Sequence, residues 1–142
     1  MRLSVTTPRG AIVEAEIDEV TAPGQLGEFG VLPGHVPLMA ALKPGVLTYR
    51  APDHTGTLAV GEGFLQVTPA MMGGRATDRV LVLVDQAMTA ASVDRTAAER
   101  EFAHAEAEIA GWKRDLDGSY QALVVRRDWA LAQIAAARQV AS

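Results

Sequence analysis

The side chains that could carry out chemistry are few in this 142-residue chain and lie far apart in the sequence. There is no cysteine, which excludes thiol nucleophiles, disulfides and thiolate metal sites. The three histidines, His35, His54 and His104, are never within four residues of one another, so the spacing of a helical zinc site is absent. No Gly-x-Ser-x-Gly elbow is present. We therefore predict no catalytic residue, no metal site and no cofactor.

Four glycines, Gly24, Gly27, Gly30 and Gly34, have a spacing that superficially suggests a phosphate-binding loop. No Lys-Ser/Thr pair follows them and no helix is expected to begin there. The spacing therefore fits neither the Walker loop nor the dinucleotide fingerprint. We interpret these glycines as turn residues.

The distribution of charge favours a binding role. The chain has 17 acidic and 13 basic residues, the opposite of the basic surplus typical of nucleic-acid-binding proteins. Near the C-terminus, Arg126, Arg127 and Arg138 are opposed only by Asp128. A solvated helix face and a basic face for an acidic partner both explain this pattern, and both stay open.

The chain has two parts of different composition, and these parts must position the residues named above. All seven prolines and eleven of the thirteen glycines lie at or before Gly74, whereas 15 of the 25 alanines lie from Ala90 onward. Turn-forming residues thus dominate the first part and the best helix former dominates the second. We predict two domains, a β-sandwich over residues 1–88 and helices over residues 89–142.

Alternation of apolar and polar residues predicts many short strands in the first domain, packed as a sandwich or flattened barrel. The strand-like runs are Leu3–Val5, Ala11–Val20, Val46–Tyr49, Thr57–Val60, Phe64–Val67 and Val80–Val84. We expect a long loop over residues 22–37. We also expect a hairpin loop with exposed or partly buried methionines at Met71–Arg75.

The second domain is predicted to be an antiparallel helical hairpin. Ser92 is the expected N-cap, and the second helix begins at about Tyr120. The first helix has one apolar seam, made by Ala98, Phe102, Ala105, Ile109 and Trp112. Each helix should have roughly 22 residues, or about 33 Å. Because alanines bury little apolar area, we expect the hairpin to be weakly held and able to move.

The run Pro23–Leu38 (PGQLGEFGVLPGHVPL), continued by Leu42–Gly45, resembles the signature of the epsilon subunit of the F-type ATP synthase, called delta in mitochondria. Thr7–Gly10, Gly63–Val67 and Val80–Ala87 resemble its opening turn, its Gly-Phe-x-x-Val strand and its last strand. The resemblance implies a ten-stranded β-sandwich followed by a helical hairpin. It also implies a non-catalytic central-stalk subunit that couples the c ring and gamma to ATP synthesis.

The resemblance further implies partners, location and contact residues. The partners would be the gamma subunit, the c-subunit ring, and the alpha and beta subunits, with membrane contact only through the complex at the cytoplasmic face of the bacterial inner membrane. Docking on gamma and the c ring would use Glu28, Phe29, Leu32, Pro33 and His35. Arg126, Arg127 and Arg138 would meet an acidic segment of beta when the hairpin extends along gamma and blocks ATP hydrolysis.

Some members of this family bind ATP between the hairpin and the sandwich through an Ile/Leu-Asp-x-x-Arg-Ala motif. Residues 93–98 match it at Asp94 and Ala98, but Ala97 stands where the phosphate-holding arginine is expected. We expect weak or absent nucleotide binding. The alternative function is that of a nucleotide-sensing protein with the same fold, and the missing arginine counts against it.

Overall fold

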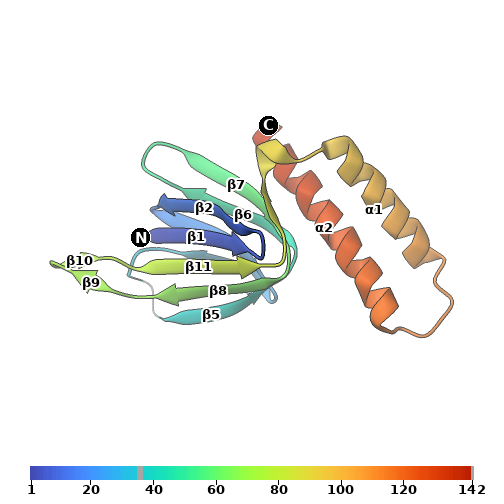
Figure 1. The fold of residues 1–142 in the computed structure, drawn as a ribbon, viewed down its shortest axis with the longest axis horizontal. Helices are drawn as coiled ribbons and strands as arrows, with labels where there is room; N and C mark the ends of the chain where they lie inside the picture. Colours follow the sequence, from blue (N-terminus) through green and yellow to red (C-terminus); the bar gives the residue numbers. More distant parts are fainter. Residues whose placement is uncertain (35–36, 142) are drawn as a thin grey trace.

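The computed structural model consists of a β-sandwich with a helical hairpin standing at one end of its strands (Figure 1). It describes residues 1–34 and 37–141. The strands are β1 (Arg2–Thr7), β2 (Gly10–Glu16), β3 (Glu19–Gly24), β4 (Gly27–Val31), β5 (Leu38–Leu42), β6 (Gly45–Arg50), β7 (Thr55–Val60), β8 (Gly63–Thr68), β9 (Met71–Met72), β10 (Arg75–Ala76), β11 (Arg79–Val84) and β12 (Ala87–Thr89). The helices are η1 (Ala90–Ser92), α1 (Arg95–Ala110) and α2 (Gly118–Ala141).

Ten of these strands belong to one continuous sheet that folds over into two layers. Its order is β12-β7-β6-β3-β5-β8-β11-β1-β2, with β4 paired to β3. The two layers meet where β3 pairs with β5 through the single pair Gly24–Leu42. Alternate residues of each strand point inward, as Leu3 and Val5 do in β1, and both are fully buried. Fourteen such residues, together with Ile17 between β2 and β3, form the sandwich core.

The hairpin packs on the sandwich through α2, which lies between α1 and the strands (Figure 1). The side chains that are buried where α2 packs on β6 and β7 are small. Its buried members are Ala59, Ala90, Ala132 and Ala136, with Val46, Met88 and Trp129 partly buried around them. We call this the alanine interface. It buries far less apolar volume than the sandwich core, because its fully enclosed side chains are single methyl groups.

The structure confirms the predicted order of a sandwich of about ten strands followed by two antiparallel helices. The expected loop over residues 22–37 is wrong in its first part, because β3 and β4 form a hairpin there with a turn at Gln25 and Leu26. The expected N-cap Ser92 is also wrong. Asp94 caps α1 by accepting a hydrogen bond from the Ala97 N–H (3.0 Å), and Ser92 ends the short helix η1. The first helix has 16 residues, shorter than expected.

Within the described residues, no helix combines the length and the apolar character needed to cross a membrane.

Candidate docking surfaces

An exposed apolar patch covers the outer side of the layer that contains β5, β8 and β11. The register places Ala41 beside Phe64 and Phe64 beside Leu83, and in the next row Gln66 lies between Met39 and Leu81. Met39, Phe64 and Leu83 are 66%, 54% and 48% exposed. With Gln66 and Leu81 they line a shallow hollow of about 210 Å³. We call Met39, Phe64, Leu81 and Leu83 the outer apolar face.

The same layer becomes polar toward β1 and β2. Ser4 lies beside Leu81, and Glu14 lies beside Ser4. At the far edge the Arg2 guanidinium approaches the Glu14 and Glu16 carboxylates at 3.7 and 3.8 Å. The outer apolar face therefore ends at polar and charged residues toward β1 and β2, whereas beyond Met39 at the β5 edge it borders a second hollow lined by Leu26 and Phe29. An exposed apolar patch of this kind is usual for a surface that a partner covers.

Sequence reasoning did not identify the outer apolar face, although the sequence contains a signal for it. Residues 80–84 are apolar without interruption, whereas a strand with one face in water alternates. Such a run means that both faces of β11 are apolar. Val80, Val82 and Val84 are buried in the sandwich core, which leaves Leu81 and Leu83 on the outer side.

The structure separates the predicted docking residues into two groups. Glu28 and Phe29 lie near the start of β4, and Glu28 pairs with Pro23. Leu32 (55% exposed) and Pro33 follow the other end of β4, about 13 Å further along at the usual rise of a strand. The predicted docking residue His35 lies outside the described residues. The two groups therefore occupy opposite ends of the sandwich.

The Glu28 end faces helix α2 across an open groove of about 470 Å³. Glu28, Lys43 and Val46 line its sandwich side, and Asp128 and Leu131 line its helix side. Because the walls belong to the two halves of the chain, any displacement of the hairpin would remove one wall of this groove.

The Leu32 end is held by a buried carboxylate that sequence reasoning also missed. Asp78 is 2% exposed, and its two oxygens accept backbone hydrogen bonds from Gly34 (2.6 Å) and Ala70 (3.1 Å). The Gly34 N–H, followed by the Ala70 N–H, lowers the pKa of Asp78 below its ordinary value of 3.8. Asp78 thereby joins the loop after β4 to the segment that follows β8.

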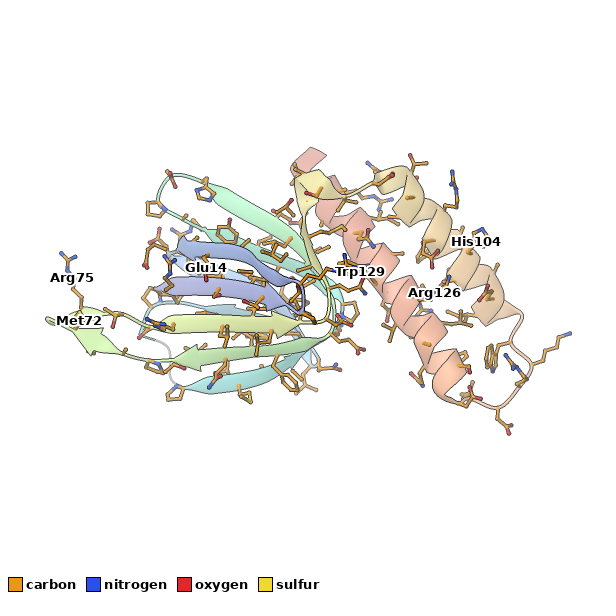
Figure 2. All side chains as sticks on the ribbon, viewed as in Figure 1. Glu14, Met72, Arg75, His104, Arg126 and Trp129 are labelled. Atoms are coloured by element: carbon orange, nitrogen blue, oxygen red, sulfur yellow. The ribbon has the colours of Figure 1, made fainter. Side chains whose placement is uncertain are left out.

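The three predicted beta-contact arginines do not form one free surface. Arg126 of α2, labelled in Figure 2, lies on the hairpin. It reaches across to Glu101 of α1, with its Nε and Nη2 at 2.8 and 2.5 Å from the Glu101 Oε1. Arg127 reaches Glu106 (3.4 Å) and Asp128 (3.1 Å). Hydrogen bonding to Glu101 raises the pKa of Arg126, and that to Asp128 raises the pKa of Arg127.

Arg138, by contrast, is exposed near the end of α2 and makes no ion pair with the residues that the structure describes.

The residues of the partial nucleotide motif have structural roles in this arrangement. The Asp94 carboxylate is occupied as the N-cap of α1. Ala98 is 3% exposed and packs in the hairpin. The neighbouring Arg95 is paired with Glu99 at 3.1 Å. Among residues 1–34 and 37–141, no group of three or more His, Asp or Glu side chains is arranged to hold a metal ion.

Comparison with known proteins identifies the family. The family model for the β-sandwich domain of the ATP synthase delta/epsilon chain matches residues 1–90. The chain belongs to the ATP synthase delta/epsilon family. It is 40% identical over 109 residues to ATP synthase epsilon chain 2 of Syntrophotalea carbinolica, covering 77% of this chain and 73% of that one. It is 37% identical over 134 residues to the ATP synthase epsilon chain of Magnetococcus marinus, covering 94% and 91%.

Two solved structures share the fold. A chain of the Euglena gracilis mitochondrial ATP synthase, solved as OSCP, F1 and c-ring, superposes with a TM-score of 0.74 at 20% identity, covering 94% of this chain and 79% of that chain. A chain from the central stalk and c-ring of the Tetrahymena thermophila mitochondrial ATP synthase gives a TM-score of 0.63 at 18% identity, covering 96% of both chains. These likenesses extend over the hairpin as well as the sandwich.

Family membership confirms the resemblance carried by residues 23–45. It also confirms the prediction that the chain is a non-catalytic subunit, because its relatives are epsilon chains of a larger enzyme.

Proposed function

We propose that this chain is an epsilon-type central-stalk subunit of an F-type ATP synthase, and that it docks on the gamma subunit through the outer apolar face. The relatives named above are ATP synthase epsilon chains, and one of the similar structures comes from a central stalk. The observation that carries the docking proposal is the exposure of Phe64 and Leu83 side by side on one sheet face. A half-exposed phenylalanine inside an apolar patch is the kind of anchor that a partner buries.

The c ring is assigned to the end of the sandwich that carries the β3–β4 turn. Leu26 projects there without any shielding (105% exposed), next to Glu28 and Phe29. Leu32 and Pro33, at the opposite end, are proposed as further contacts of gamma. We divide the contacts in this way because β4 separates Glu28 from Leu32, and a single flat partner surface would not reach both ends of the sandwich.

The sandwich (1–88) is proposed to dock and the hairpin (89–142) to regulate, inhibiting ATP hydrolysis when α2 reaches the alpha and beta subunits. The small alanine interface supports a hairpin that detaches. Arg126 and Arg127 are engaged by α1 glutamates, so these surface ion pairs must break before the arginines meet an acidic segment of beta. Arg138 is exposed already.

The proposed location is the cytoplasmic face of the bacterial inner membrane, reached only through the complex. The bacterial origin of the relatives supports it. Nucleotide sensing remains the less favoured alternative, because Asp94 is occupied as a helix cap and Ala97 replaces the expected arginine.

The docking proposal is tested by measuring the affinity of the full chain for its gamma subunit with and without Phe64→Ser. Phe64 is 54% exposed, so covering its remaining surface contributes about half of the ~1.5–3 kcal/mol of a fully buried phenylalanine, and the dissociation constant should rise about four- to fifteen-fold. Leu116→Ser is the control, because Leu116 is an exposed apolar residue (71%) in the α1–α2 turn, away from the sandwich. Equal affinities of wild type and Phe64→Ser would contradict docking through this face.

A further inference from the structure

A narrow two-stranded arm, residues 69–78, projects from the sandwich at the end opposite the helices (Figure 1). Its strands β9 and β10 pair with each other and not with the main sheet. The turn residues Gly73 and Gly74 have φ angles of +59° and +78°, as a type I′ hairpin turn requires. Met71 and Met72 are 69% and 74% exposed, which is unusual for two adjacent methionines without a partner.

The arm continues the β8–β11 ribbon in one unbroken register. Thr68 pairs with Arg79, and four residues further along each strand Met72 pairs with Arg75. Between the two pairs the Thr77 N–H donates to the Ala70 carbonyl at 2.8 Å, while the Ala70 N–H donates to the Asp78 carboxylate, so the junction keeps the register although the backbone ladder is interrupted there.

The register determines which arm residues share a face with the outer apolar face. Successive side chains of a strand point to opposite sides, so an even number of steps keeps the side. Met72 is eight residues beyond Phe64 and therefore lies on its side of the ribbon, whereas Met71 lies on the other. The junction obeys the same alternation, because Asp78 is buried while its neighbours Thr77 and Arg79 are exposed.

We infer that the arm extends the same side of the sheet beyond the outer apolar face, past the polar pair Thr68–Arg79, and contacts the same gamma subunit, with Met72 and Arg75 as its contact residues. This inference rests on the proposed function. Figure 2 shows both side chains at the end of the arm, away from the sandwich. Methionine adapts to irregular protein surfaces, and Arg75 adds a charged donor beside it.

Two features make the arm suited to a protein partner. Its base is fixed by Asp78, whose carboxylate accepts hydrogen bonds from the Ala70 and Gly34 N–H groups. The arm should therefore lose little conformational entropy when it binds a partner. Its tip is Gly73-Gly74, whose backbone polar groups would lose their water if the tip entered a lipid bilayer. A lipid surface is therefore disfavoured as the occupant.

The test compares two single substitutions in the full chain, Met72→Ser and Met71→Ser, in binding to the gamma subunit. The two residues are adjacent, of the same type and almost equally exposed, and differ in the face they occupy. We expect Met72→Ser to raise the dissociation constant about tenfold and Met71→Ser to change it less than about twofold. Both variants should keep the wild-type melting temperature, because neither side chain is buried.

Unchanged affinity of Met72→Ser, or equal weakening by both substitutions, would overturn the inference. If Phe64→Ser weakens gamma binding and Met72→Ser does not, the inference alone fails; if the wild-type chain does not bind gamma, the proposed function fails with it. Anionic phospholipid vesicles provide the second measurement. Vesicle binding that Met72→Ser abolishes while gamma binding is unchanged would assign the arm to the membrane and overturn the inference.

Discussion

Replacing Ala136 by leucine should release the helical hairpin while the sandwich stays folded. Ala136 is fully buried in the alanine interface, in one cluster with Ala59, Ala90 and Ala132. Leucine adds three carbon atoms where no space is open to solvent. The sandwich has a separate core of fifteen buried residues. The extra volume should therefore weaken the docking of α2 and not the folding of the sandwich.

The magnitudes show that this single change is large enough to shift the docking equilibrium of the hairpin. A buried methyl group contributes about 0.8 kcal/mol, so the four alanines together contribute about 3 kcal/mol, apart from the partly buried residues around them. Overpacking a close-packed site costs about 1–3 kcal/mol. The substitution therefore removes from one third to all of the alanine contribution. Each 1.4 kcal/mol shifts the ratio of docked to released hairpin about tenfold.

The release is measured as a distance between two spin labels by double electron–electron resonance. The chain has no native cysteine, so Glu62→Cys in the β7–β8 turn and Leu116→Cys in the α1–α2 turn give specific labelling at exposed positions. Ala136→Leu should broaden and lengthen the distance distribution. Ala103→Leu, the same change at an exposed site on α1, should leave it unaltered. An unaltered distribution in Ala136→Leu would refute the reasoning.

Three further predictions follow from the charged groups and the partial motif. Charge reversal at Arg126 and Arg127 should increase ATP hydrolysis by the reconstituted synthase, more strongly at low salt, and unchanged hydrolysis would exclude these arginines from inhibition. Because the folded-state pKa of Asp78 lies below 3.8, its stabilisation is present above that pH and is lost as the pH falls through the lower value. In urea unfolding, Asp78→Asn should thus have a lower free energy of unfolding than the wild type at pH 7, and the difference should shrink below pH 4. The exposed Asp115→Asn should show no such difference. An equal loss of free energy by Asp78→Asn at pH 7 and below pH 4 would contradict this role. Calorimetric titration of the full chain with ATP should give no micromolar binding, since Ala97 replaces the phosphate-holding arginine, and a saturable micromolar isotherm would reverse this conclusion.

The features predictable from the sequence are those that depend on neighbouring residues. Leu3 and Val5 alternate with polar residues and are buried, as a strand with one core face requires. The seam residues Ala98 and Ala105 are the buried residues of α1, because their spacing of seven returns to the same helix face. The capping residue of α1 is not decided by local sequence alone, since Ser92 and Asp94 are both good caps. Ser92 instead bonds Thr89 through its hydroxyl at 2.7 Å.

The features that the sequence concealed depend on residues far apart in the chain. The Asp78 carboxylate binds Gly34, 44 residues away, and no local pattern marks that pair. The strand β12 has only three residues and is defined by its pairing with β7. The family resemblance implies one docking set that includes Glu28 and Leu32, yet β4 carries these two residues to opposite ends of the sandwich.

The division of the chain into a docking sandwich and a regulatory hairpin is tested most directly by ATP hydrolysis in reconstituted synthase. The comparison is between the complete chain and a chain that ends at Ser92, which keeps β12 and η1. Both chains should assemble with gamma in equal stoichiometry, and the complex with the shortened chain should hydrolyse ATP faster. Equal hydrolysis rates in the two assembled complexes, or failure of the shortened chain to assemble, would contradict the account.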